Sequence, residues 1–100
     1  MRLFVLLFAA FLSMSALAAG DPVAGKAKSM ICAACHGQDG ISPNDIWPNL
    51  KGQKKGYLVK QIKAFKTGVR VDPSMAPMVS MLNDQDIENI AAYYASLGSD

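Results

Sequence analysis

The pentapeptide Cys32-Ala33-Ala34-Cys35-His36 constrains this 100-residue chain more than any other feature, because it holds both cysteines and the one histidine of the sequence. A structural zinc site needs four such ligands, and the whole chain has three. A thioredoxin-type redox pair follows a strand of a βαβ unit, and no strand-like alternation of useful length appears. A plain disulfide between Cys32 and Cys35 leaves His36 without a role.

Covalent attachment of a c-type haem uses all the reactive side chains of this motif. Two thiols form thioethers with the haem vinyl groups, and the next residue ligates iron from the same turn. Beyond residues 1–18, the chain has 36 apolar side chains among 82 residues and long loops, so a domain of this size needs a cofactor to complete its core. We therefore expect one haem c attached through Cys32 and Cys35, with His36 as the proximal axial ligand of the iron.

Residues 1–18 have the composition of a secretory signal peptide. Arg2 precedes ten unbroken apolar residues, and the segment ends in the small-x-small sequence that a signal peptidase requires. The alternative is an uncleaved anchor helix, but the apolar run is shorter than the roughly 20 residues that span a bilayer. We expect cleavage after Ala18, a periplasmic location, and a mature domain of residues 19–100 with no permanent membrane span.

Helical periodicity predicts an all-α domain with three main helices joined by long loops. The first begins at Asp21 and Pro22, the second covers residues 56–67 and ends at Gly68, and the third begins at the N-cap residue Asn83 and ends at Gly98. The apolar stripes of the three helices are Val23, Ala27, Met30, Ile31 and Ala34; Leu58, Ile62 and Phe65; and Ile87, Ile90, Ala91, Tyr94 and Leu97.

The second axial position of the iron calls for a soft donor, and a methionine thioether is the usual one in cytochromes c. Met30 suits the core side of the first helix. The other methionines of the mature chain fall in an irregular stretch and are Met75, Met78 and Met81. Their spacing also fits simple core packing, and a lysine is a further alternative. Because Pro77 favours extended geometry at Ala76, we expect the two methionines on either side to point in different directions.

Several further segments accompany the attachment motif in a fixed order: residues 19–21, 48–53, 57–62, 68–70, 75–78, 82–87 and 91–94. With them the chain resembles class I c-type cytochromes, particularly the small bacterial monohaem proteins and the single domains of the dihaem cytochrome c4 group. The resemblance covers residues 19–100. It implies the class I cytochrome c fold, with three main helices and long loops wrapped around one covalently attached haem.

The resemblance also implies roles for single residues. Met75, seven residues before Leu82, corresponds to the distal iron ligand, and Met78 corresponds to a second, packing methionine and is the runner-up for the ligand. Pro48 corresponds to the residue whose carbonyl accepts a hydrogen bond from the His36 ring and tunes its basicity. Candidates for contacts with the haem edge or propionates are Trp47, Gln53, Tyr57 and Arg70.

His/Met ligation leaves no open position on the iron, so we expect a one-electron carrier and not an enzyme. Alternatives are a haem subunit of a larger dehydrogenase or oxidase and, less favoured, a protein that binds peroxide or nitric oxide. Residues 51–70 contain seven basic and no acidic side chains, which suggests a docking segment for redox protein partners. The net charge of about +1 for the mature chain argues against a nucleic-acid partner.

Overall fold

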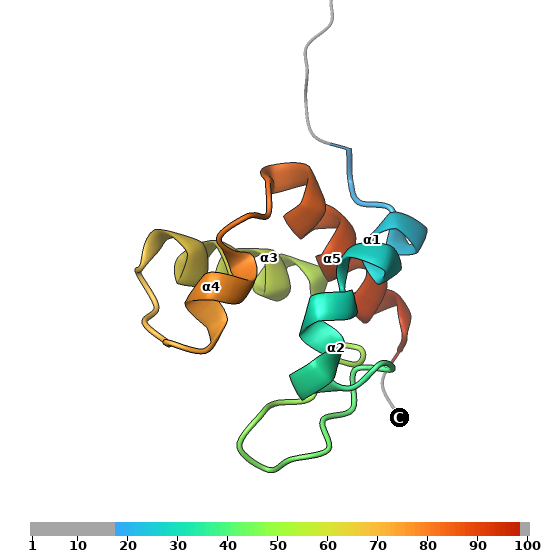
Figure 1. The fold of residues 1–100 in the computed structure, drawn as a ribbon. Helices are drawn as coiled ribbons and strands as arrows, with labels where there is room; N and C mark the ends of the chain where they lie inside the picture. Colours follow the sequence, from blue (N-terminus) through green and yellow to red (C-terminus); the bar gives the residue numbers. More distant parts are fainter. Residues whose placement is uncertain (1–17, 99–100) are drawn as a thin grey trace, which may run out of the picture.

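The computed structural model describes residues 18–98, so the predicted signal peptide lies, apart from Ala18, outside the described residues. This part of the chain contains five α-helices and no strand, which confirms the all-α prediction (Figure 1). The helices are α1 (Pro22–Lys28), α2 (Met30–His36), α3 (Lys55–Thr67), α4 (Met75–Val79) and α5 (Asp84–Ser96). No helix within residues 18–98 is long and apolar enough to cross a membrane.

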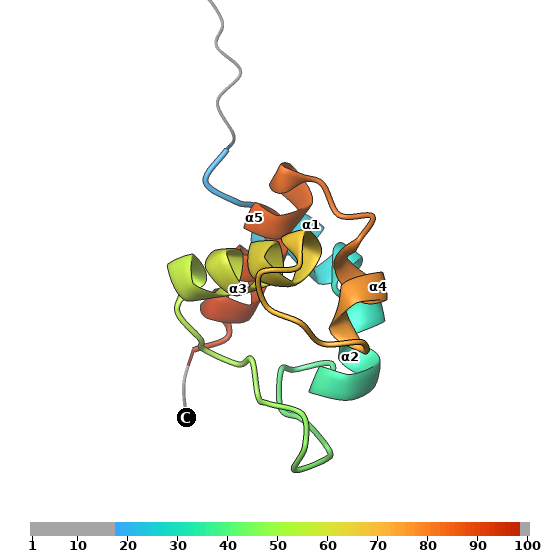
Figure 2. The same ribbon diagram turned by 90° about the vertical axis from the view of Figure 1, so that its left-hand side faces the viewer.

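Helix α5 is the centre of the fold, and both α1 and α3 pack against it (Figures 1 and 2). Most of the buried apolar side chains belong to α5 or to the segment that leads into it. They are Leu58, Val79, Leu82, Ile87, Ile90, Ala91, Tyr93 and Tyr94. The core is therefore small and concentrated on one face of the molecule, as the sequence predicted for a domain that depends on a cofactor.

The predicted limits of α3 and α5 are confirmed within one or two residues. Gly68 ends α3 in the left-handed conformation at φ 82°. At the start of α5, Asn83 Oδ1 accepts from the amide of Asp86 at 2.7 Å, and Asp86 Oδ2 accepts from the amide of Asn83 at 3.0 Å. This reciprocal pair satisfies two amides that the first turn of a helix leaves without partners.

The first predicted helix is divided in two at Ser29. The Ser29 hydroxyl donates to the carbonyl oxygen of Lys26 at 2.8 Å, which competes with the regular helical ladder. Ser29 is the C-cap of α1 and the N-cap of α2. The break turns α2 away from the direction of α1, so that the cysteine motif occupies a short helix of its own (Figure 1).

The apolar stripe of that first helix does not face α5, contrary to the sequence pattern. Val23 is 79% exposed and Met30 is 66% exposed, whereas Gly25 and Ser29 are buried. Gly25 is required at the crossing, because a Cβ there would lie 1.8 Å from the carbonyl oxygen of Asn89 on α5. The two backbones approach too closely for a larger side chain, so the smallest residues and not the most apolar ones form the contact.

Helix α4 was not expected, because its residues include Pro77. Proline is tolerated in the first turn of a helix, where its missing amide hydrogen has no helical partner. Asp72 supports this turn, since its carboxylate accepts from the amides of Ser74 at 2.8 Å and Met75 at 3.1 Å. The extended geometry predicted for Ala76 is therefore wrong: Ala76 is helical.

Candidate cofactor site

The three side chains of the attachment motif lie on α2. Cys32 and His36 are four positions apart, and Cys32 and Cys35 are three apart, so all three project from neighbouring positions on one side of the helix. Both cysteines are half-buried and neither forms a disulfide. Within residues 18–98, no group of three or more His, Cys, Asp or Glu side chains is placed to hold a metal ion.

His36 is 7% exposed, and its orientation is set by one hydrogen bond. Its Nδ1 lies 2.8 Å from the carbonyl oxygen of Pro48, as the resemblance implied. A carbonyl oxygen can only accept, so Nδ1 carries the proton and donates it. The lone pair of the neutral ring is then on Nε2, which is the nitrogen available to a metal.

Burial sets the acidity of Cys32. Loss of hydration raises the pKa of this thiol to about 11, although the Tyr94 hydroxyl lowers it and the nearby Cys35 raises it further. Redox-active and nucleophilic cysteines have lowered pKa values and stand in electropositive surroundings. A thiol with a raised pKa does not suit a thioredoxin-type redox pair.

The candidate distal ligands lie on and after α4. Met75 is half-buried and packs against the apolar core, at the turn that Asp72 caps. Met78 is 43% exposed and Met81 is 92% exposed. The structure thus places the first methionine inside the fold and the other two at its surface. Asp72 was missed by sequence reasoning, although an aspartate directly before a proline is a recognisable signal for the start of a turn.

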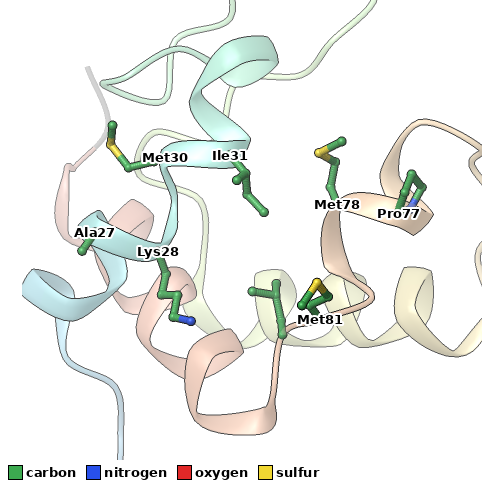
Figure 3. A pocket seen from close by; sticks show the side chains of 8 residues that line it. Ala27, Lys28, Met30, Ile31, Pro77, Met78 and Met81 are labelled. Carbon is green, nitrogen blue, oxygen red and sulfur yellow. The ribbon is translucent and has the colours of Figure 1, made fainter.

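An apolar groove of about 540 Å³ separates α2 from α4 (Figure 3). Ile31 of α2 and Met78 of α4 project into it from opposite walls, and Met81 lies at its base. His36 and Met75 lie on the same two helices but do not line this groove. An exposed apolar gap of this size is typical of a bound apolar group or an interface.

The four residues predicted to contact the haem edge or propionates lie on α3 and in the loops on either side of it, and two of them already have other hydrogen-bond partners. Arg70 donates to Gln61 Oε1 at 2.7 Å and stacks over the Phe65 ring at 4.5 Å, so its guanidinium is engaged with α3. Tyr57 is 49% exposed. Gln53 accepts from the amide of Lys54 at 2.8 Å and so helps to start α3. Trp47 is half-buried in the loop that also carries Pro48.

The sequence and the fold both match known proteins. The pattern of the Cytochrome c family matches residues 22–98. Cytochrome c4 of Pseudomonas aeruginosa is 49% identical over 79 residues, which are 79% of this chain and 39% of that protein. Cytochrome c-554(548) of Halomonas halodenitrificans is 48% identical over 81 residues, 78% of this chain and 98% of that protein. The crystal structure of reduced recombinant cytochrome c4 from Pseudomonas stutzeri has a TM-score of 0.76 at 44% identity, covering 81% of this chain and 48% of that one.

These matches agree with the helical fold, the paired thiols and the imidazole whose Nε2 is available, and together they define a class I c-type cytochrome domain. The chain belongs to the cytochrome c family and carries covalently attached haem c. It spans about 40% of the length of the cytochrome c4 relatives and nearly all of cytochrome c-554(548).

Proposed function

We propose that the protein is a periplasmic one-electron carrier, not an enzyme. Cys32 and Cys35 hold the haem through thioethers, and His36 and Met75 ligate its iron. The observation that carries this proposal is the 2.8 Å contact between His36 Nδ1 and the Pro48 carbonyl oxygen, which leaves Nε2 for the metal. The haem supplies reversible exchange of one electron between the ferrous and ferric states.

The protein residues have three tasks in this function. Cys32 and Cys35 would fix the cofactor to α2, and His36 and Met75 would both ligate its iron, which would leave no ligand position for a substrate. The hydrogen bond to Pro48 raises the basicity of the imidazole and keeps its tautomer fixed. Because neither ligand has to leave or rotate when the electron arrives, the geometry suits rapid electron exchange with a partner.

The attachment is tested on protein purified from the periplasm. Haem should remain with the polypeptide through acidified organic extraction, and the intact mass should equal the chain from Ala19 plus one haem. Cys32→Ala and Cys35→Ala should each lower the yield of haem protein, because the haem stabilises only the folded state. Colour that passes into the organic phase would contradict covalent attachment, and a mass that includes Met1 would contradict cleavage after Ala18.

The basic segment, residues 51–70, has fewer unpaired lysines than its sequence suggests. Lys55 forms an ion pair with Glu88 at 2.5 Å, and Lys66 donates to the carbonyl oxygen of Leu82. Among the described residues, Lys54 and Lys60 are exposed and form no ion pair. We propose that these two lysines contribute most to a surface that attracts an acidic redox partner.

Charge reversal at Lys60 tests this proposal with hexacyanoferrate(III), an anionic acceptor, as the probe. At low ionic strength, Lys60→Glu should slow oxidation of the ferrous protein by roughly two- to fivefold, because it replaces attraction by repulsion. The difference should shrink near 0.1 M salt, where screening limits such forces to about 10 Å. Lys26→Glu, an equal charge change at an exposed site on α1, is the control. Equal rates for both variants at every salt concentration would show that the segment is only a solvated face.

A further inference from the structure

The segment that follows α2, residues 37–54, contains no helix and is closed at its base by hydrogen bonds to α5. On its first limb, the Tyr93 hydroxyl donates to the carbonyl oxygen of Gln38 at 2.9 Å, across 55 positions of sequence. On its second limb, the amide of Gly52 donates to the carbonyl oxygen of Tyr94 at 2.9 Å. Two consecutive residues of α5 therefore hold both limbs of the loop.

The two limbs are also joined to each other close to Pro48. The carbonyl oxygen of Gly40 accepts from the amides of Leu50 and Lys51 at 2.7 and 3.0 Å. Pro48 precedes Leu50 by two residues, so these bonds fix the part of the second limb whose carbonyl faces His36. The position of that carbonyl depends on the whole closed loop and not on the local sequence alone.

We propose that Tyr93 is a positioning residue for His36, because its hydroxyl anchors the loop that holds the Pro48 carbonyl against Nδ1. The inference rests on the proposed function, in which His36 ligates iron through Nε2. Tyr93 is 7% exposed and its bond to the Gln38 carbonyl is partly buried, so removal of the hydroxyl takes away one of the bonds that close the loop on α5. Without this anchor, the loop opens more often, Nδ1 loses its acceptor more often, and the imidazole becomes a weaker donor to the iron.

The other two tyrosines of the chain provide controls of equal size. Tyr94 is 1% exposed, and its hydroxyl lies beside the Cys32 thiol and makes no hydrogen bond to the loop of residues 37–54. Tyr57 is 49% exposed near the start of α3. Tyr→Phe removes a single oxygen atom at each position and keeps the ring. Each variant therefore loses one hydroxyl group, and Tyr93 is the one of the three whose hydroxyl bonds to the loop of residues 37–54.

The experiment compares these variants as haem-loaded proteins. In Tyr93→Phe, exchange of the His36 Nδ1 proton with deuterium, followed by NMR, should be about tenfold faster than in the unaltered protein. Its reduction potential should rise, because a less basic imidazole stabilises the ferric state less. Tyr57→Phe and Tyr94→Phe should both leave the exchange rate unchanged. Unchanged exchange in Tyr93→Phe, or equal acceleration in all three variants, would overturn the inference.

A second measurement uses the unaltered protein and needs no variant to fold. The His36 Nδ1 proton and the amide proton of Leu50 should exchange through one shared opening of the loop, with the same dependence on denaturant. Unequal dependence would contradict the role of the closed loop. A spectrum of the unaltered protein that lacks a histidine-ligated low-spin iron would overturn the proposed function and this inference with it. A histidine-ligated spectrum with unchanged exchange in Tyr93→Phe would overturn this inference alone.

Discussion

Met75→Ala is expected to abolish the thioether-to-iron charge-transfer absorption of the oxidised protein. The substitution removes the sulfur, while the Asp72 carboxylate still accepts from the backbone amide of residue 75, so the turn of α4 should remain. The vacant axial position should then bind added imidazole or azide. The reduction potential should fall, because methionine ligation favours the ferrous state. Absorption spectra and a redox titration check both results.

Met78→Leu is the matched control on the same helix. Met78 is 43% exposed on the wall of the groove, so a swap of similar volume should keep the band and cost under about 1.5 kcal/mol of stability. Loss of the band in Met78→Leu and its retention in Met75→Ala would assign the iron to Met78. Retention in both variants would point to Met81 or a lysine.

Gly25→Ala should destabilise the protein by about 3 kcal/mol, which for a domain of this size lowers the melting temperature by roughly 10 to 20 °C. The new Cβ would lie 1.8 Å from the carbonyl oxygen and 2.4 Å from the carbonyl carbon of Asn89. Both atoms belong to the backbone of α5, so no flexible side chain can move aside. The crossing of α1 and α5 must therefore open, and thermal unfolding of the haem protein measures the cost.

Gly56→Ala is the control for this prediction, since Gly56 is also a helical glycine. A Cβ at Gly56 would meet nothing within 4 Å. Gly56 is the second residue of α3, and alanine is favoured over glycine in a helix by up to about 0.5–1 kcal/mol, so this variant should be at least as stable as the unaltered protein. Similar melting temperatures for the two variants would show that the close contact between α1 and α5 does not limit stability.

Local sequence signals were sufficient where the stabilising contacts are themselves local. The ends of α3 and α5 depend on Gly68 and on the pair Asn83 and Asp86, and these residues act on atoms within a few positions of themselves. The small apolar core was also predictable in outline, because Ile87, Ile90 and their neighbours on α5 have helical spacing and face one side.

The same periodicity gave the wrong answer for the first helix. Its apolar residues were assigned to the core, but Ile31 lines the groove and Val23 is exposed. Periodicity shows that a helix has an apolar side and does not show which neighbour covers that side. In a haem protein the cofactor covers part of the apolar surface of the helices. The face of the first helix that packs against α5 is the one that carries Gly25 and Ser29.

The sequence by itself predicted the chemistry of the cofactor site. Cys32, Cys35 and His36 are neighbours in the chain, so their residue types and spacing already predict two thioethers and an iron ligand. The tertiary structure decided how the ligand is held. The Pro48 carbonyl is 12 positions from His36, and the Tyr93 hydroxyl is 55 positions from the Gln38 carbonyl to which it donates, so both contacts form only after the loop has closed on α5. Contacts between residues so far apart in the sequence depend on how whole helices and loops pack together, and local sequence patterns do not predict that packing.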